Sequence, residues 1–76
     1  MTIFLTAKAE LGRVKGVAEG MAKIDEVSAV YLISGKFDIV AKIDAEGDAA
    51  IDLVVDKILK IPGISETRTL LAKKVK

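Results

Sequence analysis

Apolar and polar positions follow two periods along the chain, and together they predict four strands and two helices in the order βαββαβ. Apolar runs rich in β-branched and aromatic residues predict strands at residues 2–9, 27–34, 37–44 and 64–75. Apolar residues three and four apart predict amphipathic helices over 11–24 and 47–61. Pro62-Gly63 ends the second helix.

Each predicted helix carries one apolar stripe that should face the sheet. In the first helix the stripe is Leu11, Val14, Val17, Ala18, Met21 and Ile24. In the second it is Ala50, Ile51, Val54, Val55, Ile58 and Ile61. Gly12, Gly16 and Gly20 recur at every fourth position of the first helix, where each costs about 1 kcal/mol relative to Ala. This spacing indicates a close approach of the helix to a neighbouring backbone, or it is a coincidence on the solvent-facing side of the helix.

A short internal sequence similarity supports the interpretation that the chain has two similar halves. The segments KIDEVS at residues 23–28 and KIPGIS at 60–65 each link a helix to the next strand. With right-handed crossovers in both halves, the element order predicts an α+β, ferredoxin-like βαββαβ fold, a four-stranded antiparallel sheet with two helices on one face. Residues 1–76 are expected to form a single domain.

A chain of 76 residues is near the lower limit for a self-sufficient core. It has no Cys and no His, which removes disulfides and most structural metals and leaves oligomerisation as the remaining means of stabilisation. The chain is 51% hydrophobic, and its predicted strands alternate poorly between apolar and polar positions. We therefore expect a second subunit to cover the sheet face that the helices leave open.

The stretch YLISGKFDIVAKID, residues 31–44, predicts a hairpin whose register depends on loop length. A two-residue loop pairs Ile33 with Asp38 and mixes charged with apolar residues on one face. A three-residue loop pairs Ser34 with Asp38 and is preferred, because it places an apolar set beneath the helices. That set is Ala29, Tyr31, Ile33, Ile39, Ala41 and Ile43. The other face then holds Ser34, Asp38, Val40 and Lys42.

On a covered face the Asp38 carboxylate needs a partner. The candidates are Lys42, threonine hydroxyls of the last strand, or the ammonium group of a ligand. From spacing alone, a structural ion pair is favoured over a ligand site.

Several function classes are disfavoured by composition. Twelve basic and eleven acidic residues give a net charge of +1, which provides no strong positive potential to attract the phosphates of DNA. No apolar stretch approaches the roughly 20 residues of a membrane helix, and no signal peptide is recognisable, so we expect a cytoplasmic protein without membrane contact. Without Cys or His the chain lacks a thiol nucleophile and an imidazole base, which argues against an enzyme. No phosphate loop or calcium loop is present, and we expect no cofactor or metal.

Three segments resemble the effector-binding domain of the leucine-responsive regulatory protein/AsnC family, also called the RAM domain. The stretch IDEVSAVYLISGKFDIVAKI resembles the family's helix end, strand and Gly-x-aromatic-Asp hairpin. LKIPGI resembles its Leu-Pro-Gly-Val turn, and ETRTLLAKKVK its Thr-x-Thr strand. The resemblance covers nearly the whole chain but only the sensor half of a full-length member. The absence of Asn and Gln also resembles the composition of hyperthermophile proteins.

The resemblance implies a ferredoxin-like fold, dimers of the dimeric α+β barrel type that form through their sheets, and assembly into octamers. It also implies that a small effector, typically an amino acid, binds between subunits. By position it assigns ligand-binding roles to Tyr31, Ser34, Gly35, Asp38, Thr67, Thr69, Leu71 and Ala72. The family's helix-turn-helix has no counterpart in this sequence, so no direct DNA binding is expected. Lys36 stands where the family often has an acidic residue.

The sequence therefore predicts a stand-alone amino-acid-sensing module that oligomerises and modulates transcription regulators indirectly. One alternative is a structural module that hetero-oligomerises with full-length Lrp/AsnC-type regulators and binds no ligand. A small dimeric α+β barrel enzyme is the other.

Overall fold

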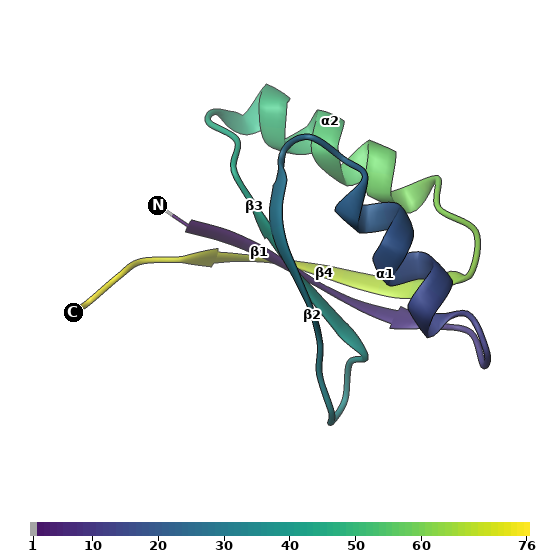
Figure 1. Ribbon diagram of the computed structural model, residues 1–76. Helices are drawn as coiled ribbons and strands as arrows, with labels where there is room; N and C mark the ends of the chain where they lie inside the picture. Colours follow the sequence, from purple (N-terminus) through teal and green to yellow (C-terminus); the bar gives the residue numbers. More distant parts are fainter. Residues whose placement is uncertain (1) are drawn as a thin grey trace.

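The computed structural model describes residues 2–76 and contains four strands and two helices in the predicted order (Figure 1). The elements are β1 (Thr2–Ala9), α1 (Val14–Ala22), β2 (Val27–Leu32), β3 (Ile39–Ile43), α2 (Asp48–Leu59) and β4 (Ile64–Ala72). The first strand has the predicted bounds. The other elements are shorter at one or both ends, because regular hydrogen bonding stops before the apolar pattern does.

The strands form one antiparallel sheet in the order β2-β3-β1-β4. Both helices lie on the same side of this sheet (Figure 1). The α+β ferredoxin-like arrangement predicted from the sequence is thus confirmed. β1 and β3 are the central strands, and β2 and β4 are the edges.

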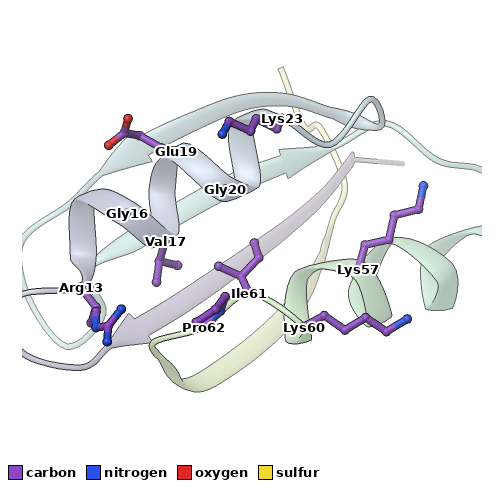
Figure 2. Close-up of a pocket in the computed structure, with 10 residues that line it drawn as sticks. All are labelled: Arg13, Gly16, Val17, Glu19, Gly20, Lys23, Lys57, Lys60, Ile61 and Pro62. Atoms are coloured by element: carbon purple, nitrogen blue, oxygen red, sulfur yellow. The ribbon is translucent and has the colours of Figure 1, made fainter.

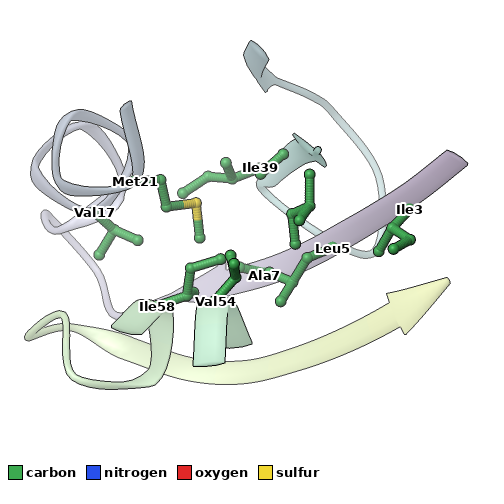
Figure 3. Close-up of a cluster of buried hydrophobic side chains, with 10 residues drawn as sticks. Ile3, Leu5, Ala7, Val17, Met21, Ile39, Val54 and Ile58 are labelled. Carbon is green, nitrogen blue, oxygen red and sulfur yellow. The ribbon is translucent and has the colours of Figure 1, made fainter. Parts of the chain in front are cut away.

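The core lies between the helices and one face of the sheet (Figure 3). Val17 and Met21 of α1 and Val54 and Ile58 of α2 point towards the side chains of β1 and β3. The buried set is Ile3, Leu5, Ala7, Val17, Met21, Ile39, Ala41, Ile43, Val54 and Ile58. The predicted helix stripes are therefore confirmed in their central positions.

The start of α1 differs from the prediction. The helix begins at Val14, three residues later than expected, and Gly12 lies in the preceding turn with φ +81°. A left-handed residue cannot continue an α-helix, and Leu11 before it is fully exposed. Leu11 and Gly12 were wrongly placed in the helix.

The preferred hairpin register is also wrong. Leu32 pairs with Ile39 and Tyr31 with Val40, and the Ile33 N–H donates to the Asp38 carbonyl at 2.9 Å. This is the register of the shorter loop. A shift in register between Val27 and Ala29 explains how it keeps an apolar inner face.

Because of this β-bulge, β2 changes parity along its length. Val27 lies opposite Ile43 and Val30 opposite Ala41, so both valines share the helix-side face with the buried residues of β3. Tyr31 and Ala29 fall on the opposite face, where the prediction had not placed them. Period-two reasoning cannot locate such a bulge, because it assumes an unbroken alternation.

No helix within residues 2–76 is long and apolar enough to cross a membrane. The four residues after β4 run away from the sheet (Figure 1), and the side chain of Val75 is almost fully exposed.

Candidate ligand-binding site

Asp38 lies just before β3 and ties the hairpin to the end of β1. Its backbone N–H donates to the Ala7 carbonyl at 3.0 Å, and its Oδ2 accepts a hydrogen bond from the Ala9 N–H, also at 3.0 Å. The carboxylate is half-buried. The partner that Asp38 needed is therefore a backbone amide. Among residues 2–76 it forms no ion pair with Lys42 and no bond to a threonine hydroxyl.

The hairpin is exposed from Tyr31 to Lys36. Ser34 and Gly35 lie in its loop, and Gly35 has φ +123°, a conformation that favours glycine. Tyr31 is 58% exposed on the sheet face away from the helices. These residues form an accessible surface, and none of them is enclosed within this chain.

The predicted residues of the last strand divide between the two faces of the sheet. Thr67, Thr69 and Leu71 lie opposite Ala7, Leu5 and Ile3 of β1, so they share the helix-side face. Ala72 and its neighbour Leu70 lie on the open face. Leu71 is 64% exposed, because the helices leave this part of the edge strand uncovered.

One chain does not bring the predicted site residues of the two edge strands together. Tyr31 is on edge strand β2 and Thr69 on edge strand β4, with two strands between them. Three strand spacings amount to about 14 Å. Tyr31 and Thr69 can therefore contact one small ligand only if they come from different subunits. Asp38 lies nearer to β4, because its N–H donates to Ala7, the β1 partner of Thr67.

The open face of the sheet combines an apolar centre with charged surroundings. Pairing with β1 places Phe4 opposite both Lys42 and Leu70, and Thr6 opposite both Val40 and Arg68. The Arg68 guanidinium lies 5.9 Å from the ring centroid of Phe37. The side chains of this face are Thr2, Phe4, Thr6, Lys8, Ala29, Tyr31, Val40, Lys42, Glu66, Arg68, Leu70 and Ala72.

The surface has hollows that the sequence did not indicate. One of about 390 Å³ lies between the start of α2 and β4, and Leu71 is the only predicted site residue that lines it. A larger one, of about 560 Å³, runs between the two helices and contains none of the predicted residues (Figure 2). Its residues come from two segments some 40 positions apart, so no local motif could have revealed it.

A single ion pair joins the segment before β2 to α2 within the described residues. Lys57 Nζ lies 3.1 Å from Glu26 Oε1 and 3.2 Å from Oε2. The hydrogen bonds from Lys57 lower the pKa of Glu26 below its ordinary value of 4.5. No cluster of acidic side chains suited to a metal ion occurs within residues 2–76.

Comparison with known proteins identifies the family. Residues 2–76 match the family model of the Lrp/AsnC ligand binding domain. The chain belongs to the Lrp/AsnC family. Over 74 residues this Lrp/AsnC domain is 32% identical to the HTH-type transcriptional regulator FL11 of Pyrococcus horikoshii, a match that covers 97% of the chain and 49% of FL11. The chain thus spans about half the length of that relative.

Solved structures of other proteins share the fold. TTHA0845 of Thermus thermophilus is 30% identical and superposes with a TM-score of 0.88, covering 99% of this chain and 95% of that one. The regulator NMB0573 of Neisseria meningitidis, solved as a complex with L-Met, superposes with a TM-score of 0.83. It is 18% identical, and the match covers 99% of this chain and 51% of that one. At that identity the likeness shows the fold alone.

Proposed function

We propose that this Lrp/AsnC ligand-binding regulatory domain is a non-catalytic module that binds an amino acid between subunits and modulates transcription regulators indirectly. The observation that carries the proposal is the separation of the predicted site residues. None of them is fully buried, and those on the edge strands β2 and β4, such as Tyr31 and Thr69, lie about 14 Å apart. An interface with a second subunit would enclose a ligand that would stay exposed to solvent on a single chain.

The open sheet face supports the assembly part of the proposal. Phe4, Tyr31, Val40 and Leu70 give it an apolar centre, and no helix of the same chain covers it. A second copy packed through the same face would bury these side chains in a dimer. Dimers would then join into an octamer, and the hairpin of one dimer would contact a neighbouring dimer.

Asp38 supports an amino acid as the effector. One carboxylate oxygen, Oδ2, accepts the hydrogen bond from Ala9, while Oδ1 has no hydrogen bond from residues 2–76. An ammonium group is a suitable donor to this second oxygen, because a charge-assisted hydrogen bond is stronger than a neutral one. NMB0573, which shares the fold, was solved with L-Met.

A thermal-shift screen of the twenty amino acids tests this function. A ligand at a hundred times its Kd stabilises a protein by about 2.7 kcal/mol. For a domain of this size that corresponds to a rise in Tm of roughly 10 °C or more. At least one amino acid is expected to produce such a rise.

Asp38→Asn is the informative variant for the screen. The asparagine Oδ1 can still accept the Ala9 hydrogen bond, so the fold is retained while the charge is removed. The shift should be lost in Asp38→Asn and kept in Lys74→Ala, a control in the exposed tail. If no amino acid shifts the wild-type Tm, the ligand part of the proposal is wrong.

The second candidate function is a structural module that joins full-length regulators and binds no effector. The bond between Asp38 and Ala9 favours it, because this bond gives the carboxylate a structural role without a ligand. Capture of a purified full-length Lrp/AsnC regulator in the absence of amino acids, together with a flat thermal-shift screen, would establish it.

A further inference from the structure

The groove between α1 and α2 lies on the side of the molecule away from the open sheet face (Figures 1 and 2). Its volume is about 560 Å³. The floor is formed by Val17 and Ile61, which point between the helices, and by Pro62 (Figure 2). Gly16 and Gly20 form part of the α1 wall. The groove would stay accessible if the sheets of two copies pack together.

Charge is concentrated around this groove. Its lining includes four basic side chains, Arg13, Lys23, Lys57 and Lys60, and one acidic side chain, Glu19. The whole chain, by contrast, has twelve basic and eleven acidic residues. Lys57 is paired with Glu26, and the other three cations have no ion-pair partner within residues 2–76. The rim is therefore locally positive on a nearly neutral molecule.

Gly16 is not required by the packing of the fold. A Cβ built on it would meet no atom within 4 Å, and its φ is not positive. At Gly20, by contrast, a Cβ would lie 3.2 Å from Ile61 Cγ2, so the contact of α1 with the turn after α2 accounts for that glycine. A glycine inside a helix is destabilising relative to alanine. Gly16 thus weakens α1 while leaving the backbone of the groove wall accessible.

The cations are distributed along the groove. Arg13 and Lys23 flank α1 and are ten positions apart, which corresponds to about 15 Å along a helix. The side chains of Lys23, Lys57 and Lys60 extend outwards and do not converge on one point (Figure 2). A single phosphate would need convergent donors, whereas an extended chain of carboxylates matches distributed cations.

We propose that the groove between α1 and α2 binds an acidic polypeptide segment of a partner protein. The segment's carboxylates would pair with Arg13, Lys23 and Lys60, and its backbone would approach α1 at Gly16. This partner site is separate from the effector site of the proposed function, and its test does not depend on amino-acid binding.

Fluorescence anisotropy with a labelled twelve-residue peptide of alternating Asp and Gly tests the proposal. Saturable binding that weakens with added salt is expected for the intact chain. Each exposed ion pair contributes a few-fold in affinity at most, so reversing two cations in Arg13→Glu/Lys60→Glu should weaken binding roughly tenfold or more. Lys74→Glu/Lys76→Glu makes the same change in net charge in the C-terminal tail and should leave affinity unchanged.

Gly16→Ala separates the groove from general stability. The variant should raise the Tm, because alanine is the better helix former, and should still weaken peptide binding. Circular dichroism establishes that each variant is folded. Absence of peptide binding at low salt, or equal loss in the groove and tail variants, would overturn the proposal. So would tighter binding of a DNA duplex that Arg13→Glu/Lys60→Glu abolishes, since this would assign the groove to nucleic acid.

Discussion

At the scale of single residues, Asp38 shows how a backbone partner can replace an expected side-chain partner. The sequence indicates a carboxylate on the open face that needs a hydrogen bond. The structure supplies it from the Ala9 N–H at the end of β1, 29 positions away in the chain. Ala9 also lies where the β1–β4 register shifts, so its amide has fewer regular partners.

Asp38→Ala should therefore destabilise the fold more than Asp38→Asn. Alanine leaves the partly buried Ala9 N–H without its acceptor, which costs about 1 kcal/mol. Asparagine keeps an acceptor oxygen at the same place. Urea unfolding of both variants in the absence of ligand measures the difference. Equal stabilities of Asp38→Ala and the wild type would show that this hydrogen bond contributes nothing.

At the scale of the elements, short contacts fix how strands and helices fit together. The bulge between Val27 and Ala29 sets which residues of β2 face the helices. The pair of Glu26 and Lys57 joins the start of β2 to α2. Its contribution depends on pH, because Lys57 lowers the pKa of Glu26 in the folded state.

The stabilising effect of this pair should disappear in acid. The folded pKa of Glu26 is below its ordinary value of 4.5, so the contribution is complete above that value and is lost as the pH falls through the folded pKa. Glu26→Gln should have a lower Tm than the wild type at neutral pH, and the gap should close well below pH 4.5. The difference in Tm between Lys57→Met and the wild type should close over the same pH range. A gap independent of pH would contradict the assignment.

At the scale of the whole molecule, the two sides of the sheet differ in what covers them. The helices bury one face, and the apolar centre of the other remains accessible in a single chain. Leu70 on this open face is 42% exposed, and Leu53 on the outer surface of α2 is 64% exposed. These two leucines allow a direct test of which side meets a second copy.

Leu70→Glu is expected to convert the proposed assembly into smaller species, because it would place a charge in the proposed interface between the two sheets. Leu53→Glu, on the helix side, should leave the dimer intact. Size-exclusion chromatography with light scattering at micromolar concentration distinguishes the outcomes. A monomeric wild-type chain would exclude the sheet-to-sheet dimer.

Element order, the centres of both helices and the fold class were predictable from this sequence. These features depend on the period of apolar residues over short windows, and on Pro62-Gly63 as a local stop. The resemblance carried by the hairpin and the last strand likewise pointed to the family that the comparisons show.

The tertiary structure alone decided the hairpin register, the partner of Asp38, the division of Thr69 and Ala72 between two faces, and the basic groove between the helices. The hairpin register depends on the bulge in β2, and the other three depend on contacts between segments far apart in the chain. A bulge of one residue reverses every side chain beyond it, and an amide becomes a partner only when two strands pair. Local sequence patterns contain no information about such distances, which is why the elements were predictable and their juxtaposition was not.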